Sequence, residues 1–497
     1  MAAIRPETEI DRTQAALARH GLKLPLARGS VEIAVARDVA ETEVAQRIVY
    51  VLVNELARMK GVVSAIHLAG VGEEPTLPGI PLRAAGFASG LSQLVESLNG
   101  PGSPLRSELV LGSCPDPHAR VRVGEASGGG LRIAADSWRA LTGGWSDEAD
   151  WHAAAPYGSA LAAGLAAAEI FKTLLSVNSV ETPARKLEDL AYSLFNYGTG
   201  TEATIGPAVT ALELTSTALA GCGAGGTAAL DVLVMQPGLT GTIDLIEPGS
   251  HKLSNINRYP FVTASDIHEG RHKLASAIGH LAVFAPALAV TVHARPWEQL
   301  AAHPFGLVVS AVDTIEARWA IQARAAPDAT IIDAAVLGLL YSVLRVAPGG
   351  WCLECKHPYD PELALKQRAA RWGEPLEIIR AWTIEERTVD AAMIGALAAT
   401  QNRPVEDFAG LVGLPFSEAP RLTECGTTSM QTTVPSQAPV LPLATVPLGA
   451  LLAAEITKHH LFPEAALNNW LAHDLLRSPA RPRIARRAAR PDCPRHS

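Results

Sequence analysis

The sequence contains few cysteines and no long hydrophobic run, and each shortage excludes a class of protein. Six cysteines in 497 residues are too few for the disulfide framework of a small secreted protein, so we expect a reducing, cytoplasmic setting. The most apolar run, LAVFAPALAVTV at 281–292, contains Pro286 and is shorter than the roughly 18 apolar residues of a membrane span. The first residues, MAAIRPETEIDRTQ, lack the apolar core of a secretory signal. We therefore expect no membrane association and no secretion.

The sequence also lacks an excess of positive charge. Its formal net charge is −8, from 42 Lys and Arg against 50 Asp and Glu. A general nucleic-acid binder needs surplus Lys and Arg to neutralise phosphates, so we expect no nucleic-acid partner. The chain is instead rich in apolar material, with 48% hydrophobic residues. Its length predicts roughly two to four domains, each with a sizeable core.

Alternating strand-like and helical segments predict layered α/β domains. In the first part, VEIAVA and VVSAIHLAG are typical of strands, and ETEVAQRIVYVLVNELARM between them is typical of an amphipathic helix. A Gly- and Pro-rich region at 99–130 interrupts the pattern, a helix is predicted at 157–176, and the polar segment 177–186 is the predicted boundary. From about residue 205, the runs GTIDLIEPG, LAVTVHA, GLVVSAVD and ATIIDAAVLG predict a largely parallel sheet.

A weak internal repeat links the two parts of the chain. AAEIFK at 167–172 resembles AAEITK at 453–458, and both lie in Ala/Leu-rich helical runs. Because such helices are common, chance similarity explains the repeat equally well. If the repeat is real, the chain contains two related halves, of which only the second carries chemistry.

The segment GCGAGG has the spacing of a phosphate-binding loop. It places Gly221, Gly223 and Gly226 between a predicted strand and an Ala-rich helix. Glycines let the backbone approach a phosphate, and the N-terminus of the helix offers free N–H groups. Glu247 ends a predicted strand about 20 residues later, where a carboxylate accepts hydrogen bonds from ribose hydroxyls. A nicotinamide dehydrogenase would explain these features equally well.

The residues after Glu247 favour a triphosphate site. Asn255 and Arg258 lie in SNINRYPF, Lys273 in GRHKLASA, and Asp313 in SAVDTIEARWAI. Three phosphates require cations and a divalent metal requires a carboxylate, whereas hydride transfer requires neither. Taken singly, the two cations are equally explained as surface charges, and Asp313 as the N-cap of the next helix. Their joint order at strand ends favours nucleotide chemistry.

This ordered set resembles the ThiF/MoeB/ubiquitin-activating superfamily over about residues 205–355 and 425–497. The resemblance implies an α/β, Rossmann-like adenylation fold that binds ATP and Mg²⁺ and adenylates the C-terminal carboxylate of a ubiquitin-like protein. It implies that the three glycines line the nucleotide and that Glu247 holds the ribose. The remaining residues would contact phosphates (Asn255, Arg258 and Lys273) or coordinate Mg²⁺ (Asp313). Charge that spreads over the phosphates during carboxylate attack suits these residues.

The chain departs from the family pattern at one position. The family usually has D-x-D where this sequence has EPG, so Glu247 replaces the first aspartate and Gly249 the second. A glutamate still suits a ribose. Loss of the second acid makes metal binding depend more on Asp313.

The resemblance also implies a zinc site, because family members often carry two C-x-x-C pairs that close around Zn²⁺. Here WCLECKHP supplies Cys352 and Cys355, and PDCPRHS supplies Cys493 and His496. Thiolates and imidazole both suit tetrahedral Zn²⁺, so we expect a Cys₃His structural site. The alternatives are a redox motif for the first pair and a basic tail, with seven arginines between 477 and 495, that contacts nucleic acid.

Cys425 is the candidate nucleophile. It lies in TECGTTSM, ahead of the helical run LGALLAAEITK, and in the resembling family this segment often bears the cysteine that receives the carrier as a thioester or persulfide. A thiolate near a helix start or cations attacks well. The alternative is a small buried residue, and the connection to the helix is longer than the family pattern. Cys222 and Cys114 are interpreted as structural.

By the resemblance, residues 1–180 form an inactive adenylation-like domain, 187–355 the ATP-binding part of the active domain, 356–424 a helical insertion, and 425–497 the crossover segment, final helix and zinc-binding tail. The pairing of an inactive with an active half predicts a pseudo-dimer within one chain. Arg5 and Arg12 are candidates for a phosphate contact from the inactive half, although an exposed helix charge explains either one better.

The function expected from the resemblance is that of a bacterial, BilD-like activating enzyme in a ubiquitin-like conjugation pathway of antiviral defence. It would adenylate a ubiquitin-like protein with a C-terminal glycine, form a thioester on Cys425, and pass the protein to a conjugating enzyme. One alternative is a sulfur-carrier or peptide-modifying adenylyltransferase. Another is a non-catalytic scaffold of the same fold.

Overall fold

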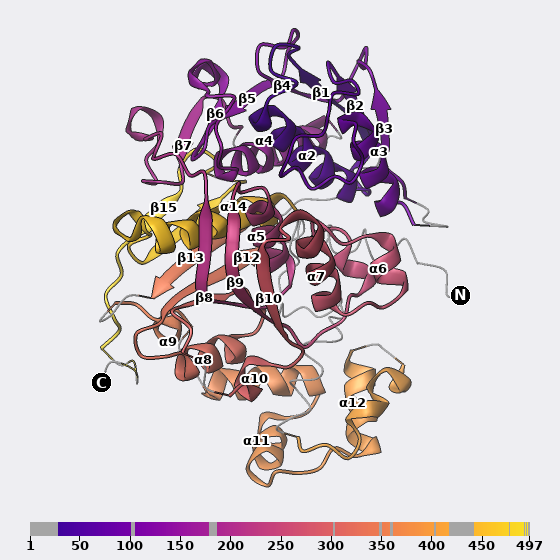
Figure 1. Cartoon of the computed structure of the whole chain (residues 1–497). Helices are drawn as coiled ribbons and strands as arrows, with labels where there is room; N and C mark the ends of the chain where they lie inside the picture. Colours follow the sequence, from indigo (N-terminus) through magenta and orange to yellow (C-terminus); the bar gives the residue numbers. More distant parts are fainter. Residues whose placement is uncertain are drawn as a thin grey trace. The chain divides into compact units, whose positions relative to one another are not determined.

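The computed structural model describes residues 28–100, 105–177, 186–301, 304–346, 350–357, 361–401, 404–416, 442–476, 478–491, 493 and 495 (Figure 1). Arg5 and Arg12 lie outside this range. The chain divides into two compact units, one of residues 1–353 and 439–490 and the other of residues 354–438 and 491–497. None of the described helices combines the length and the apolar character that crossing a bilayer requires.

The first unit contains a seven-stranded sheet with the order β3-β2-β1-β4-β5-β6-β7. Its parallel strands are β1 (Gly29–Val35), β2 (Val63–Ala69), β3 (Glu108–Leu111), β4 (Ala119–Val123) and β5 (Leu131–Ala135). The antiparallel strands are β6 (Arg139–Thr142) and β7 (Leu190–Ser193). The helices of this part are α2 (Glu43–Arg58), α3 (Phe87–Leu98) and α4 (Tyr157–Val177). The region at 99–130 therefore contains two strands that the sequence did not predict, and β7 follows the predicted boundary in the chain.

The same unit contains a second sheet of eight strands, with the order β10-β9-β8-β11-β12-β13-β14-β15. Its parallel strands are β8 (Leu212–Ala220), β9 (Leu239–Ile246), β10 (Leu288–His293), β11 (Leu307–Ser310) and β12 (Thr330–Leu337). The antiparallel strands are β13 (Leu340–Val346), β14 (Trp470–Asp474) and β15 (Arg483–Ala485). The helices are α5 (Ala224–Val234), α6 (Ala264–His268), α7 (Lys273–Phe284), α8 (Ile315–Arg324) and α14 (Pro442–Leu461). The predicted α/β, Rossmann-like fold class is confirmed.

The two sheets share one topology. Counted from its own first strand, each sheet runs 3-2-1-4-5-6-7, with β15 added as an eighth strand at the end of the second sheet, and each changes from parallel to antiparallel after its fifth strand. Helix α4 precedes β7 as α14 precedes β14, and these two helices carry the AAEIFK and AAEITK segments. The strands that follow also match in sequence, as LAYSLF at 190–195 and LAHDLL at 471–476. The two repeated segments therefore lie at equivalent positions relative to their sheets.

The repeated residues contact each other reciprocally. Nζ of Lys172 in α4 donates to the carbonyl of Leu475 after β14, at 3.2 Å. Nζ of Lys458 in α14 donates to the carbonyl of Leu194 after β7, at 2.9 Å. Each lysine also pairs with a buried glutamate three residues earlier in its own helix. Helices α4 and α14 pack against each other between the two sheets (Figure 1), so the two halves meet through matching elements.

The second unit is helical in its described part. It contains α10 (Pro361–Trp372), α11 (Leu376–Ile384), α12 (Ala391–Thr400) and the 3₁₀ segment η5 (Val405–Leu411). Its small core combines aliphatic and aromatic side chains. The rings of Trp372 and Phe416 pack edge to face at 5.0 Å, and both residues are fully buried. This core is separate from that of the two sheets.

Candidate functional site

Most of the predicted nucleotide-site residues lie at or just beyond the carboxyl ends of neighbouring strands in the second sheet. Strand β8 ends at the glycine loop, β9 at Glu247, and β11 leads to Asp313. Strand β8 lies between β9 and β11, and the chain leaves β8 toward β9 but leaves β11 toward β12, so the connections after these two neighbouring strands run in opposite directions along the sheet. In open α/β sheets, ligands bind at such a topological switch point. The sheet therefore brings together residues that are far apart in the sequence.

The three positions of the loop that carry glycine differ in whether the fold itself requires glycine there. Gly221 has a φ of 96°, and a Cβ there would lie 2.6 Å from the carbonyl oxygen of Ala311. A Cβ on Gly226 would lie 2.0 Å from the carbonyl oxygen of Gly221. Both positions therefore require glycine for the fold itself. Gly223, the N-cap of α5, differs, because a Cβ there would meet nothing closer than the hydroxyl of Tyr259 at 3.6 Å.

Glu247 links the glycine loop to the next strand. Its Oε2 accepts from the backbone N–H of Cys222 at 3.0 Å, and its Oε1 accepts from the N–H of Gly249 at 2.8 Å. Nζ of Lys273, the first residue of α7, also donates to Oε1 at 3.1 Å. These three donors fix the carboxylate of Glu247 at the loop. Glu247 is also buried, being 5% exposed.

The glycine at position 249 has a steric reason. A Cβ there would lie 2.8 Å from Oε1 of Glu247 and 3.2 Å from Nζ of Lys273. The longer side chain of Glu247 thus occupies the space that a second acidic residue would need. The two departures from the D-x-D pattern are therefore coupled.

Arg258 is buried rather than a solvated surface charge, being 8% exposed. Its Nη1 donates to Oδ1 of Asn257 at 2.9 Å, and its guanidinium lies 5.4 Å from the ring centroid of Tyr259. Burial lowers the pKa of Arg258, and the charges of Tyr259 and Asp313 oppose that change. The interpretation of Arg258 as a surface charge is wrong.

Lys273 is also held at the site. Burial acts against its charged form, but the neighbouring Tyr259, Glu247 and Asp313 outweigh burial and raise the pKa of Lys273. Lys273 therefore carries a positive charge at any physiological pH. The charge of Asp313 acts to raise the pKa of both Arg258 and Lys273. The two cations and this carboxylate therefore belong to one electrostatic cluster.

Asp313 is not the N-cap of the helix that follows it. Thr314 takes that role, and its hydroxyl oxygen accepts from the N–H of Ala317 at 3.2 Å. The capping interpretation of Asp313 is therefore wrong. Asp313 is exposed at the end of the β11 segment, where its carboxylate suits a divalent cation.

Asn255 has a local structural role. It ends the 3₁₀ turn η3 (Leu253–Asn255), and its Oδ1 accepts from the N–H of Lys252 at 2.8 Å. This amide oxygen therefore stabilises the turn that leads to Arg258. Its predicted phosphate contact remains a prediction.

Cys222 lies inside the glycine loop but is not a nucleophile. Burial, with the charge of Glu247 in second place, raises the pKa of its thiol. It is fully buried, so its side chain packs under the turn. Cys425, the predicted nucleophile, lies outside the described residues.

Three cysteines form a candidate metal site. The Sγ atoms of Cys352, Cys355 and Cys493 lie within 4.8 Å of one another, and all three residues are buried. None of them is in a disulfide. Three converging thiols are a donor set that tetrahedral Zn²⁺ prefers. His496, the predicted fourth ligand, lies outside the described residues.

Helix α2 of the first half contributes contacts to the second half through residues that the sequence analysis did not predict as functional. Tyr50 donates from its hydroxyl to Oδ1 of Asp231 in α5 at 3.0 Å, and Arg58 contacts the segment that carries Arg258. A sequence signal for them exists. Tyr50, Asn54 and Arg58 are spaced four residues apart, which places them on one face of an otherwise largely apolar helix.

Comparisons with known proteins give the following matches. The ThiF family model matches residues 203–495. The uncharacterized protein y4jF of Sinorhizobium fredii is 27% identical over 343 residues, which cover 66% of this chain and 64% of that protein. The chain thus spans less than two thirds of the length of this relative.

Two solved structures are among the matches. Escherichia coli MccB with ATP shows 14% identity and a TM-score of 0.35, covering 56% of this chain and 65% of that one. The microcin C7 biosynthetic enzyme MccB with N-formylated MccA shows 13% identity and a TM-score of 0.34, covering 56% and 67%. Similarity at this level does not establish a common function.

Proposed function

The chain belongs to the ThiF family, and we propose on this basis that it is an ATP-dependent adenylyltransferase that activates the C-terminal carboxylate of a protein or peptide. One observation carries the proposal: the glycine loop, the Glu247–Lys273 pair, Arg258 and Asp313 belong to one site at the switch point of the second sheet. Glycines, a ribose-binding acid, two cations and a carboxylate are the parts that a magnesium nucleotide requires.

In the proposed reaction, a carboxylate oxygen of the substrate attacks the α-phosphorus of ATP. The bond from that phosphorus to the bridging oxygen of pyrophosphate breaks, which yields an acyl-adenylate and pyrophosphate. The N–H groups at the start of α5 would face the phosphates, and Glu247 would accept from the ribose hydroxyls. Arg258 and Lys273 would stabilise the negative charge that develops on the phosphates. Mg²⁺, held by Asp313, would supply further charge neutralisation.

We favour a sulfur carrier or a peptide as the substrate over thioester-forming activation of a ubiquitin-like protein. Adenylation needs only the site that we propose at the switch point of the second sheet. A thioester on Cys425 and transfer to a conjugating enzyme need a further nucleophile and a further partner. These steps remain predictions, and the ubiquitin-like protein with a C-terminal glycine is the second candidate substrate.

A non-catalytic scaffold is the alternative from another class. A scaffold would have no need to bury Arg258 beside the site or to pair Lys273 with Glu247. Buried charged groups are costly to retain, so these residues support nucleotide binding.

We further propose that the first half is an inactive copy. Its topology matches that of the second half, but the loop after β1, ARDVAET at 36–42, contains no glycine where the second half has GCGAGG. A backbone without glycine at these positions cannot approach a phosphate in the same way.

We also propose that Cys352, Cys355 and Cys493, with His496, hold a structural Zn²⁺ ion. The convergence of three buried sulfur atoms supports this proposal. The purified protein should contain one zinc per chain by mass spectrometry of metals. Cys493→Ser should lower the zinc content, whereas Cys114→Ser, a matched change of a buried cysteine in the first half, should not. Equal zinc content in both variants would contradict the proposal.

The proposed activity is tested by ATP–pyrophosphate exchange with candidate carriers and peptides. Asp313→Ala and Arg258→Ala should each reduce exchange by about 10²- to 10³-fold, the usual effect of removing one transition-state stabilising group. Cys425→Ala separates the substrate classes, because it should abolish a thiol-sensitive adduct only if a thioester forms. Absence of Mg·ATP binding in calorimetry of the zinc-loaded wild type would contradict the adenylyltransferase proposal and favour the scaffold.

A further inference from the structure

Helix α2 of the first half carries a polar stripe that faces the second half. The helix is buried from Val44 to Arg58, so each polar side chain on it needs an internal partner. Tyr50 finds one in Asp231. Asn54 donates from Nδ2 to the carbonyl of Pro260 at 2.9 Å. The stripe ends at Arg58, which is 5% exposed.

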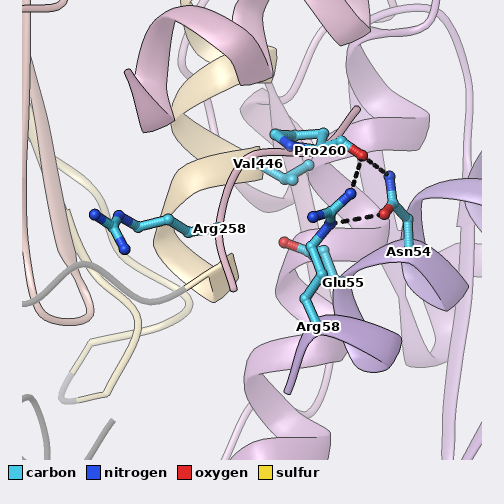
Figure 2. A pocket seen from close by; sticks show the side chains of 6 residues that line it. All are labelled: Asn54, Glu55, Arg58, Arg258, Pro260 and Val446. Carbon is cyan, nitrogen blue, oxygen red and sulfur yellow. Dashed lines mark hydrogen bonds between the residues drawn. The ribbon is translucent and has the colours of Figure 1, made fainter. Parts of the chain in front are cut away.

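Arg58 binds a set of backbone carbonyls in the second half. Its Nη1 donates to the carbonyl of Ile256 at 2.7 Å and to that of Val262 at 3.0 Å. Its Nη2 donates to the carbonyl of Pro260, and its Nε donates to Oδ1 of Asn54 (Figure 2). One guanidinium therefore satisfies three carbonyls on a segment without regular secondary structure. Without Arg58 the buried carbonyls of Ile256 and Val262 would lose this donor, at a substantial cost, whereas that of Pro260 would keep Asn54.

These carbonyls lie on both sides of Arg258 in the sequence. Figure 2 shows that the Arg258 side chain extends away from Arg58 and Asn54, and its guanidinium contacts Asn257 instead. Arg58 thus binds the backbone of segment 256–262 and leaves the Arg258 side chain to the nucleotide site. A fixed backbone restricts where the Arg258 guanidinium can lie, which is a requirement for effective electrostatic stabilisation.

We propose that Arg58 is a positioning residue for the nucleotide reaction, which holds segment 256–262 so that Arg258 meets the phosphates. This inference rests on the proposed function of the site. Arginine suits the role because its planar fork reaches several carbonyls at once, whereas the ammonium group of lysine has no such fork. The first half therefore serves the reaction although it has no phosphate loop of its own.

The test compares Arg58→Lys with Tyr50→Phe in the full-length, zinc-loaded protein. Both changes remove buried hydrogen bonds from the same face of α2, but only the first touches segment 256–262. Arg58→Lys should weaken Mg·ATP binding in calorimetry by about tenfold, an ordinary coupling between residues of one network. It should also speed amide hydrogen exchange in residues 256–262. Tyr50→Phe should change neither quantity by more than about twofold.

A double-mutant cycle with Arg258→Gln tests whether Arg58 acts through Arg258. In that background, Arg58→Lys should have no further effect on Mg·ATP binding, because the group that Arg58 positions is gone. Full additivity of the two losses would overturn the inference, as would wild-type affinity in Arg58→Lys. If Arg58→Lys does not fold, Asn54→Ala takes its place and should give a smaller loss in the same direction.

The inference and the proposed function fail in different ways. Wild-type protein that binds no Mg·ATP contradicts both the proposed function and a nucleotide role for Arg58. Wild-type protein that binds Mg·ATP, with Arg58→Lys and Tyr50→Phe indistinguishable in affinity and exchange, contradicts the inference alone.

Discussion

At the scale of single residues, the glycine loop separates the needs of the fold from those of the ligand. Gly221 and Gly226 are enclosed by backbone oxygens, whereas Gly223 has space for a methyl group. Glycine at 223, the N-cap of α5, therefore suits the close approach of a ligand rather than the packing of the loop. The G-x-G-x-x-G spacing alone could not reveal this difference, because it depends on which strands flank the loop.

Gly223→Ala should therefore reduce Mg·ATP affinity at least about tenfold while the free energy of unfolding changes by less than about 1 kcal/mol. Gly226→Ala is the contrasting variant, because its Cβ would meet the oxygen of Gly221 and overpacking typically costs about 1–3 kcal/mol. Calorimetry and urea denaturation measure the two quantities. Unchanged affinity in Gly223→Ala would mean that no phosphate approaches the loop there.

Glu55 is a buried acid in the contact between the halves. It is 2% exposed, and neither of its oxygens has a hydrogen-bond partner among the residues that the structure describes. It lines a small pocket with Asn54, Arg58 and Arg258, among others (Figure 2). Burial raises the pKa of Glu55 well above its ordinary value.

The raised pKa predicts a pH-dependent stability. Above the ordinary glutamate pKa, the unfolded chain releases a proton that folded Glu55 retains, so stability falls as pH rises, by about 1.4 kcal/mol per pH unit up to the folded pKa. Glu55→Gln should remove this loss and make the protein more stable than wild type at pH 8. Urea denaturation from pH 5 to 8 measures the effect. Parallel curves for the two proteins would show that Glu55 is ionised in the fold.

At the scale of elements, the repeated Glu–Lys pairs fasten α4 and α14 to the opposite halves. Glu455 and Lys458 are both 0% exposed, and the Nζ of Lys458 reaches the carbonyl of Leu194. Burial lowers the pKa of Lys458, and Glu455 opposes that shift. Each partner therefore depends on the other.

Lys458→Met should destabilise the protein by about 3–5 kcal/mol, because it leaves the buried Glu455 charge with only the more distant Arg345, at 3.9 Å. The double variant Lys458→Met with Glu455→Gln should recover part of the loss, since the unpaired charge is removed. Lys172→Met should cost less, because Glu169 is 7% exposed. Urea denaturation ranks the variants, and a double variant less stable than Lys458→Met would contradict this account.

Among the helices and strands, some could be predicted from the sequence and others could not. Strands such as β1, β9 and β11 lie in largely apolar runs that end in turns, and this pattern predicted them. The short strand β4, ARVRV, was missed because alternating arginines inside a Gly-rich region do not resemble a buried strand. Candidate site residues such as Glu247 and Asp313 could be proposed from the sequence because they follow predicted strand ends. The contacts of Arg58 could not be predicted from the sequence, because they join positions 198 to 204 residues apart.

At the scale of the whole chain, the two matched sheets give one polypeptide the architecture of a dimer. Helix α2 supplies Tyr50, Asn54 and Arg58 to the second half from within the same chain. A site completed by a separate subunit would lose its support on dilution, whereas a linked one does not.

Mg·ATP binding and pyrophosphate exchange per mole of protein should therefore be independent of concentration from micromolar to nanomolar. Equilibrium binding with a fluorescent ATP analogue measures the first quantity and the exchange assay the second. A loss of specific activity on dilution would show that a second copy of the chain completes the site.

The matched topology has one further consequence. When a single gene encodes both partners, every molecule receives one of each, and mismatched pairs of two inert partners never arise. Under the proposal that the first half is an inactive copy, the loop after β1 needs no glycine, and that half can serve to support its neighbour. Two identical subunits cannot specialise in this way, because each substitution appears in both of them.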